Sequence, residues 1–210
     1  AIVNDKSNNA AQTVLEGLKK LEYRGYDSWG IAIKSNQFST LTVEKHIGKI
    51  GEAKTSLPSG RIAIGHTRWA THGGVTNSNA HPHLDCQSKI AVIHNGIVEN
   101  YLDFKEILIK NGHKFSSETD TEVVAHLIEE KLKSTSIGKA VFEVFNQLIG
   151  SNAIGVIDLE TETIVACRNG SPLVIGAESA MQVRLFPEHD EPRGGGSASR
   201  SRKRGPAPSP

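Results

Sequence analysis

The helical and strand-like segments of this chain come in groups instead of alternating one by one. The segment AAQTVLEGLKKLEYRGYD places Val14, Leu15, Leu18 and Leu21 on one stripe, which predicts an amphipathic helix. Several β-branched runs follow it, and three helical segments then precede the last strand-like runs. Grouping of this kind favours a layered α+β domain over a doubly wound parallel sheet, in which strands and helices alternate.

Turn-forming residues bound each predicted element. The strands are expected around 31–33, 40–46, 61–66, 89–95, 152–159 and 163–169, with a last short one at 172–176. The three grouped helices are expected at 101–112, behind Thr119 with an apolar face that runs from Val123 to Leu132, and at about 137–148. Asn100 is a candidate N-cap of the first of these, and Thr119 with Glu122 has the spacing of a capping box for the second.

Length and composition predict one soluble globular domain. The chain has 210 residues, of which 37% are hydrophobic and 22% charged, and its formal net charge is +1. Because the chain is nearly neutral, its net charge does not indicate a partner such as nucleic acid or a charged membrane surface. No apolar run approaches the roughly 20 residues that span a bilayer, and no signal segment opens the chain. With only two cysteines, Cys86 and Cys167, we expect a reducing cytoplasm and no disulfide.

The composition changes after Gly176. Residues 177–210 contain almost no apolar side chains beyond residue 186 and are rich in Gly, Ser, Arg and Pro, which predicts an unrelated, disordered tail. The stretch SRSRKRG raises the alternative of nucleic-acid binding. It is short and has no aromatic residues, so a solvated charged tail is the preferred interpretation, and no nucleic-acid partner is predicted.

The segment HTRWATHG at 66–73 follows a strand, where polar side chains can line a cleft held by a sheet. The guanidinium of Arg68 can bind a carboxylate through two parallel hydrogen bonds, although a structural or surface ion pair is the ordinary alternative. The same choice between a cleft and the core applies to Trp69, Thr71 and His72.

Two further positions have a structural and a chemical interpretation. Asn95-Gly96 follows a strand, so it either forms a turn or offers an amide and a backbone N–H to a developing oxyanion. Asp120 either serves the first turn of the following helix or binds an ammonium group.

Histidines gather near Cys86 in the sequence. His81, His83 and Cys86 lie in AHPHLDC, and His66, His72 and His94 are not far away. Their spacing fits no structural zinc pattern, and no second cysteine lies close to Cys86. The sequence therefore predicts no metal site.

Together, these motifs resemble a known family. Six segments (LEGLKKLEYRGYDSWG, HTRWATHG, AHPH, HNGIVEN, SETDTEVVAHL and GSPLVIG) are similar to successive parts of the glutaminase domain of glutamine–fructose-6-phosphate aminotransferase, also called glucosamine-6-phosphate synthase. The resemblance covers about residues 10–176, and LEYRGYDS and HTRWATHG distinguish this family from amidophosphoribosyltransferase and asparagine synthetase. It implies a glutaminase domain at 1–176 with the N-terminal-nucleophile fold, a four-layer αββα sandwich with two antiparallel sheets.

The resemblance also implies roles for individual residues. Asn95 and Gly96 would form the oxyanion hole, Arg68 would hold the α-carboxylate of L-glutamine, and Asp120 would hold its α-ammonium group. Thr71 and His72 would line the pocket, Trp69 would lie at its mouth, and Arg24 would organise the site beside the nucleophile. Ammonia released there would pass to a sugar-isomerase domain that this chain lacks, in a full-length homo-oligomer. No cofactor is expected.

The chain departs from the family pattern at both ends. The family opens with Cys-Gly-Ile-Val-Gly and uses the thiolate of that cysteine to attack glutamine, whereas this chain opens with Ala1-Ile2-Val3-Asn4. The nucleophile would precede Ala1, and neither Cys86 nor Cys167 has a free α-amine beside it. We therefore expect a domain without its first residues and last strands, of reduced stability and without glutaminase activity. The alternative is a non-catalytic glutamine-binding or regulatory module.

Overall fold

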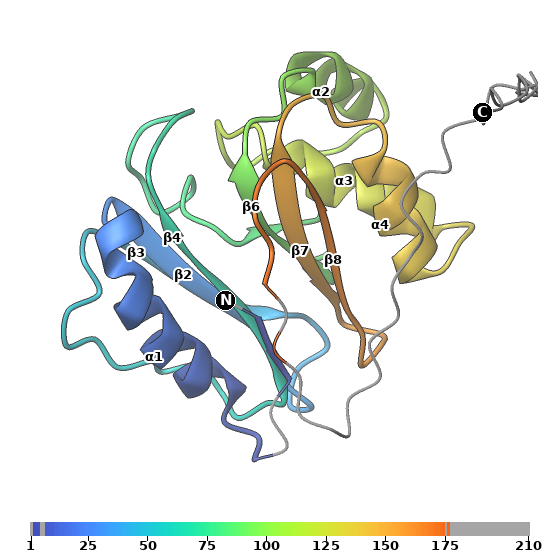
Figure 1. The fold of residues 1–210 in the computed structure, drawn as a ribbon. Coiled ribbons are helices and arrows are strands. Elements are labelled where there is room, and N and C mark those ends of the chain that lie inside the picture. The colour runs from blue at the N-terminus through green and yellow to red at the C-terminus, as the bar shows by residue number, and fades with distance from the viewer. Residues whose placement is uncertain (1, 5–6, 175, 177–210) are drawn as a thin grey trace, which may run out of the picture. The chain divides into compact units, whose positions relative to one another are not determined.

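Two antiparallel sheets lie face to face, and in the described part of the chain helices cover the outer side of each sheet (Figure 1). The computed structural model describes residues 2–4, 7–174 and 176, and residues up to 173 belong to one unit. The four-layer αββα arrangement predicted from the sequence is thus confirmed. The predicted tail, 177–210, lies outside the described residues.

The first sheet has the strand order β1-β4-β2-β3. Its strands are β1 (Ile2–Asn4), β2 (Ser28–Lys34), β3 (Thr42–Ile47) and β4 (Ile62–Arg68). Helix α1 (Ala10–Leu21) covers this sheet and continues into the short 3-10 helix η1 (Glu22–Arg24). The stripe predicted for α1 is buried at Val14, Leu15 and Leu18, because these side chains pack onto β2 and β4.

The second sheet has the order β5-β6-β7-β8. Its strands are β5 (His83–Leu84), β6 (Ile90–Gly96), β7 (Asn152–Asp158) and β8 (Ile164–Asn169). The helices on this side are α2 (Tyr101–Lys110), α3 (Glu122–Leu132) and α4 (Ile137–Phe145). β7 is buried along its whole length, since helices cover one of its faces and the first sheet the other.

Three hydrophobic clusters hold the layers together. One joins α1 to the first sheet, and the largest joins α3 and α4 to the second sheet. The third fills the space between the sheets with side chains such as Ile64 of β4, Ile93 of β6 and Ile157 of β7. Burial of this apolar surface is the main stabilising contribution. It also fixes the carboxyl ends of β4 and β6 beside each other, and these ends carry Arg68 and Asn95.

Some local predictions were wrong. The proposed capping box does not form: Thr119 Oγ1 bonds Ser117 and His83, while the carboxylate of Glu122 reaches back to Ser116 and Ser117. Asn100 does occupy the N-cap position of α2 as predicted, but its side chain binds the backbone of Gln147 and Ile149 and not the first turn of the helix. No strand is present at residues 172–174 or 176. At Thr119, Glu122 and Asn100, tertiary partners replace the local hydrogen bonds.

The helices of the described residues are short. None of them has the length and apolar content needed to cross a bilayer.

Candidate active site

A cavity of about 140 Å³ opens where β4 and β6 end. Its walls come from both sheets, from η1, and from the loops after β4 and before α3. The lining residues are Arg24, His66, Thr67, Arg68, Trp69, Thr71, His72, His81, His94, Asn95, Gly96, Thr119, Asp120 and Thr121. All eight site residues predicted from the sequence are among them, although they are spread over 97 positions of the chain (24 to 120).

Arg68 is the buried cation of this cavity. Its side chain lies at the end of β4 and donates hydrogen bonds to the carbonyl oxygens of His72, Gly73 and Gly74. Burial lowers the pKa of Arg68, and the nearby carboxylates of Asp27 and Asp120 oppose that shift. The three hydrogen bonds hold the 72–74 loop and use three of the five guanidinium N–H donors. The other two N–H groups remain able to donate to a ligand.

Asp120 is the buried anion of the cavity. One of its carboxylate oxygens, Oδ2, accepts a hydrogen bond of 2.8 Å from the backbone N–H of Val98, which follows β6. Asp120 lies two residues before α3 begins, near the positive end of that helix. The cavity therefore presents one fixed positive and one fixed negative group.

Asn95 lies at the end of β6, opposite β4. Its Oδ1 atom is 2.9 Å from Nε2 of His66. Since an amide oxygen only accepts, the imidazole must donate from Nε2, and the NH₂ group of Asn95 is left to donate elsewhere. Burial lowers the pKa of His66 to about 4, so its ring is neutral near pH 7.

Gly96 follows with a backbone that other residues rarely adopt, at φ +135°. A Cβ atom there would lie 2.2 Å from the carbonyl oxygen of Ser151. Both observations require glycine, because only glycine tolerates this φ and this close approach. The backbone at the end of β6 is thereby held in one orientation, with the Asn95 side chain beside it.

Two further histidines, His81 and His94, line the cavity and form hydrogen bonds or ring contacts with its other residues. His94 Nε2 donates to Asn152 Oδ1 at 2.9 Å, and its Nδ1 lies 2.9 Å from the hydroxyl of Thr121. His81 stacks on His66 with ring centroids 4.5 Å apart, and its Nδ1 accepts from the backbone N–H of His94. Burial lowers the pKa of His94 and holds that of His81 well below its usual range. These rings are neutral hydrogen-bonding groups that fix the floor of the site.

The mouth of the cavity is formed by η1 and the loop after β4. Gly25 lets these segments meet, because a Cβ atom there would lie 2.8 Å from the carbonyl oxygen of Thr67. This contact places Arg24 at the rim. Trp69 is 61% exposed, and its ring lies 5.6 Å from that of Tyr26. The loop is anchored by Asp27, which accepts from the backbone N–H of Ala70 at 2.8 Å.

Six lining residues have no role in the cavity according to the sequence-based prediction: His66, Thr67, His81, His94, Thr119 and Thr121. His66, His81 and His94 had been considered only as metal ligands. Their positions at strand ends were visible in the sequence, but their hydrogen bonds cross from one sheet to the other. Only the packing of the two sheets brings such partners together.

Neither cysteine lines the cavity. Cys167 lies on β8, where burial raises the pKa of its thiol to about 11. Cys86 lies in the loop between β5 and β6, against His113 and His126. The histidines beside Cys86 in the sequence, His81 and His83, are thus not its partners in space.

Comparison with known proteins agrees with this geometry. The model of the glutamine amidotransferase domain family matches residues 66–186, more than half of the chain. The chain belongs to that family. The match contains Arg68, Asn95, Gly96 and Asp120, so it covers the two buried charged groups and the β6 end of the cavity, whereas Arg24 lies outside it.

Three similar relatives carry the same name. Glutamine–fructose-6-phosphate aminotransferases (isomerizing) of Methanococcus maripaludis, Thermus thermophilus and Thermotoga maritima are 45%, 49% and 46% identical over 80–84% of this chain. The chain spans less than a third of their length, 28–30%. The glutaminase-domain resemblance is thereby confirmed.

Two solved structures share the fold. They are a glutamine phosphoribosylpyrophosphate amidotransferase from B. subtilis in complex with ADP and GMP, and an allosteric regulatory enzyme of purine biosynthesis. Their TM-scores are 0.62 and 0.63, at 28% and 30% identity over 75% of this chain and 34% of theirs. The similarity to glutamine amidotransferases thus extends from sequence to tertiary structure.

Proposed function

We propose that the cavity binds L-glutamine and that this domain supplies ammonia by hydrolysing the side-chain amide of that substrate. The observation that carries the proposal is the meeting of Arg68, Asp120 and the Asn95-Gly96 pair around one cavity. A zwitterionic amino acid needs one fixed cation and one fixed anion, and an amide carbonyl under attack needs donors for its oxygen.

Each lining residue has a role in this proposal. Arg68 binds the α-carboxylate and Asp120 the α-ammonium group. The NH₂ of Asn95, oriented by its bond to His66, and the backbone N–H of Gly96 donate to the developing oxyanion. Thr71 and His72 form the wall, Trp69 closes the mouth, and Arg24 lies on the nucleophile side.

The nucleophile is a separate question. The resemblance implies a thiolate that attacks the amide carbon, expels ammonia and leaves a glutamyl thioester, which water then hydrolyses. The only cysteines of the 210 residues lie outside the cavity. We therefore propose hydrolysis for the domain with a cysteine ahead of Ile2, and glutamine binding alone for the 210 residues taken by themselves. β1 pairs antiparallel with β4, Ile2 opposite Ile64, so a cysteine carried ahead of Ile2 would approach from the side of His66.

The aminotransferase step is also a proposal. The relatives are named for amino transfer to fructose 6-phosphate and are more than three times as long as the matched region. We infer that ammonia formed here serves a sugar-isomerising domain of that kind, in a homo-oligomeric enzyme that makes glucosamine 6-phosphate.

A binding assay and an activity assay test the proposal together. Calorimetry should show glutamine binding to the 210-residue chain, and Arg68→Ala should abolish it. A matched chain that begins with Cys-Gly-Ile-Val-Gly ahead of the first strand should release glutamate from glutamine. If that chain binds glutamine but stays inactive, the second candidate holds, a non-catalytic glutamine-binding or regulatory module. Glutamate release by the original chain that ceases in Cys86→Ala or Cys167→Ala would contradict the proposed role of the cavity.

A further inference from the structure

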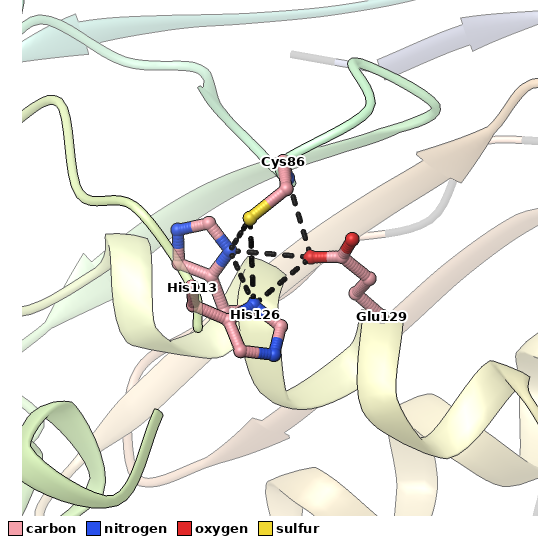
Figure 2. Close-up of side chains that lie close together, drawn as sticks. All are labelled: Cys86, His113, His126 and Glu129. Atoms are coloured by element: carbon pink, nitrogen blue, oxygen red, sulfur yellow. Dashed lines mark hydrogen bonds and ion pairs between the residues drawn. The ribbon is translucent and has the colours of Figure 1, made fainter. Parts of the chain in front are cut away.

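Four side chains with metal-binding atoms converge outside the proposed glutamine cavity (Figure 2). They are Cys86 in the β5–β6 loop, His113 after α2, and His126 and Glu129 on α3. Positions three apart on a helix share a face, so His126 and Glu129 point the same way. One sulfur, two nitrogens and one oxygen lie within 4.8 Å of one another.

Five of the six spacings between these atoms lie between 3.2 and 3.5 Å. Cys86 Sγ lies 3.5 Å from Nδ1 of His113 and 3.5 Å from Nδ1 of His126. The two Nδ1 atoms are 3.3 Å apart. Glu129 Oε2 lies 3.2 Å from Nδ1 of His113 and 3.3 Å from Nδ1 of His126.

These distances match the edges of a tetrahedron around zinc. With Zn–S of about 2.3 Å and Zn–N of about 2.0–2.1 Å, a regular tetrahedron has S···N edges of about 3.5–3.6 Å and N···N edges of about 3.3–3.4 Å. Its N···O edges are about 3.3–3.5 Å for Zn–O of about 2.0–2.2 Å. The side chains therefore leave a gap of the size that one such ion fills.

Hydrogen bonds within the cluster do not explain the convergence. Nδ1 of His113 has three heteroatom neighbours: the thiol sulfur, the second Nδ1 and the carboxylate oxygen. A ring nitrogen forms one hydrogen bond, as donor or as acceptor. The other contacts of this Nδ1 therefore have no proton between the two atoms, and their lone pairs repel each other. A shared cation removes that conflict.

The outer nitrogen of His113 contacts a carboxylate, since its Nε2 lies 2.8 Å from Oε1 of Glu130. Nε2 of His126 lies 3.7 Å from Oε1 of Glu122, which is too far for a hydrogen bond. Metal-bound histidines usually donate their second N–H to such a group, which fixes the ring and strengthens it as a ligand. The ring of Phe115, 4.6 Å from that of His126, closes one side with apolar surface.

We propose that Cys86, His113, His126 and Glu129 bind one structural Zn²⁺. A thiolate and a carboxylate balance the charge of the ion, and the two imidazoles bind as neutral ligands. The soft thiolate disfavours Mg²⁺ and Ca²⁺, and four protein ligands leave no open position for catalysis. Cys86 is solvent-exposed, so the ion can reach the site.

Such an ion would link three segments that support the cavity. The Cys86 loop leads into β6, which ends at Asn95-Gly96, and α3 begins two residues after Asp120. Zinc would cross-link these segments to the end of α2 through His113. Because the ligands belong to separate segments, metal binding contributes directly to folding stability.

Zinc content provides the first test. The 210-residue chain, stripped with a chelator and then titrated with Zn²⁺, should bind about one ion per chain and unfold at a higher temperature once loaded. Cys86→Ser should weaken zinc affinity at least about 10-fold, whereas Cys167→Ser, which changes the other cysteine, should leave it unchanged. Failure of the wild-type chain to bind zinc, or equal effects of the two variants, would overturn the site.

Cobalt and an outer-layer variant provide the second test. Co²⁺ bound to the wild-type chain should give a thiolate-to-cobalt charge-transfer band that Cys86→Ser removes and Cys167→Ser keeps. Glu130→Gln keeps all four ligands and should lower zinc affinity by about 10–100-fold, while Glu143→Gln on α4 should not. Cobalt binding without that band would exclude Cys86 as a ligand even if a variant fails to fold.

Discussion

Nε2 of His66 and Oδ1 of Asn95 lie 2.9 Å apart and join the end of β4 in one sheet to the end of β6 in the other. The contact decides which way the Asn95 amide faces: its oxygen is occupied and its NH₂ is free to donate. One hydrogen bond between the sheets thereby orients the group that the proposed function uses for oxyanion stabilisation.

Asn95→Ala should slow catalysis more than it weakens binding. In the chain that carries Cys-Gly-Ile-Val-Gly, we expect kcat for glutamate release to fall by about 10²–10³, because one oxyanion donor is lost. KM should change little, since the donor acts mainly on the transition state. Steady-state kinetics measure both. Asn100→Ala, four residues beyond the end of β6, is the matched control, and equal losses in the two variants would argue against the assigned role.

Arg68→Lys should weaken glutamine binding although it keeps the charge. Lysine lacks the planar fork that binds a carboxylate and three carbonyl oxygens at once, so we expect at least about a 10-fold loss of affinity. Calorimetry measures the change. Arg61→Lys, an exposed position just before β4, should bind as the parent chain does. Unchanged affinity in Arg68→Lys would remove this residue from the proposed carboxylate site.

Gly96→Ala should destabilise the fold. The new methyl group would meet the carbonyl oxygen of Ser151 at 2.2 Å, on a backbone held at φ +135°. Strain and crowding together should cost at least about 2 kcal/mol of the free energy of unfolding. Denaturant titration measures this. Gly74→Ala, where nothing lies within 4 Å of the added atom, should cost much less.

Stability should fall with acid in part through His66. The folded-state pKa of His66 is about 4, below the unfolded value of about 6.5, so the unfolded chain binds the proton first. The stabilising contribution is complete above about pH 6.5 and is lost as the pH falls toward 4. From pH 7 to pH 5 this amounts to about 1–2 kcal/mol.

Thermal unfolding at both pH values tests this contribution. His66→Gln should lose less stability between pH 7 and pH 5 than the parent chain does. This variant leaves unchanged two groups that face position 66, the ring of His81 and the guanidinium of Arg68. An unchanged pH dependence in His66→Gln would contradict the buried neutral imidazole.

Local patterns predicted much of the fold. The stripe of α1 and the β-branched runs follow from burial on one face, and helices grouped in sequence indicated the layered α+β class. The last predicted strand, at 172–176, is absent from the described residues, because apolar content alone does not supply a neighbour to pair with. The capping box predicted for Thr119 and Glu122 also fails, because Thr119 bonds to His83 and Glu122 bonds to Ser117 and they do not cap the first turn of α3.

The sequence by itself determined the family and eight of the fourteen residues that line the cavity, because residues such as Arg68, Asn95 and Asp120 lie in long, specific segments at element ends. It did not show that Cys86 meets His113, His126 and Glu129, and it pointed instead to the nearby His81 and His83. The physical reason is that a ligand set is defined by distances of a few ångströms in space. Packing of α2 and α3 against the second sheet creates those distances between residues up to 43 positions apart.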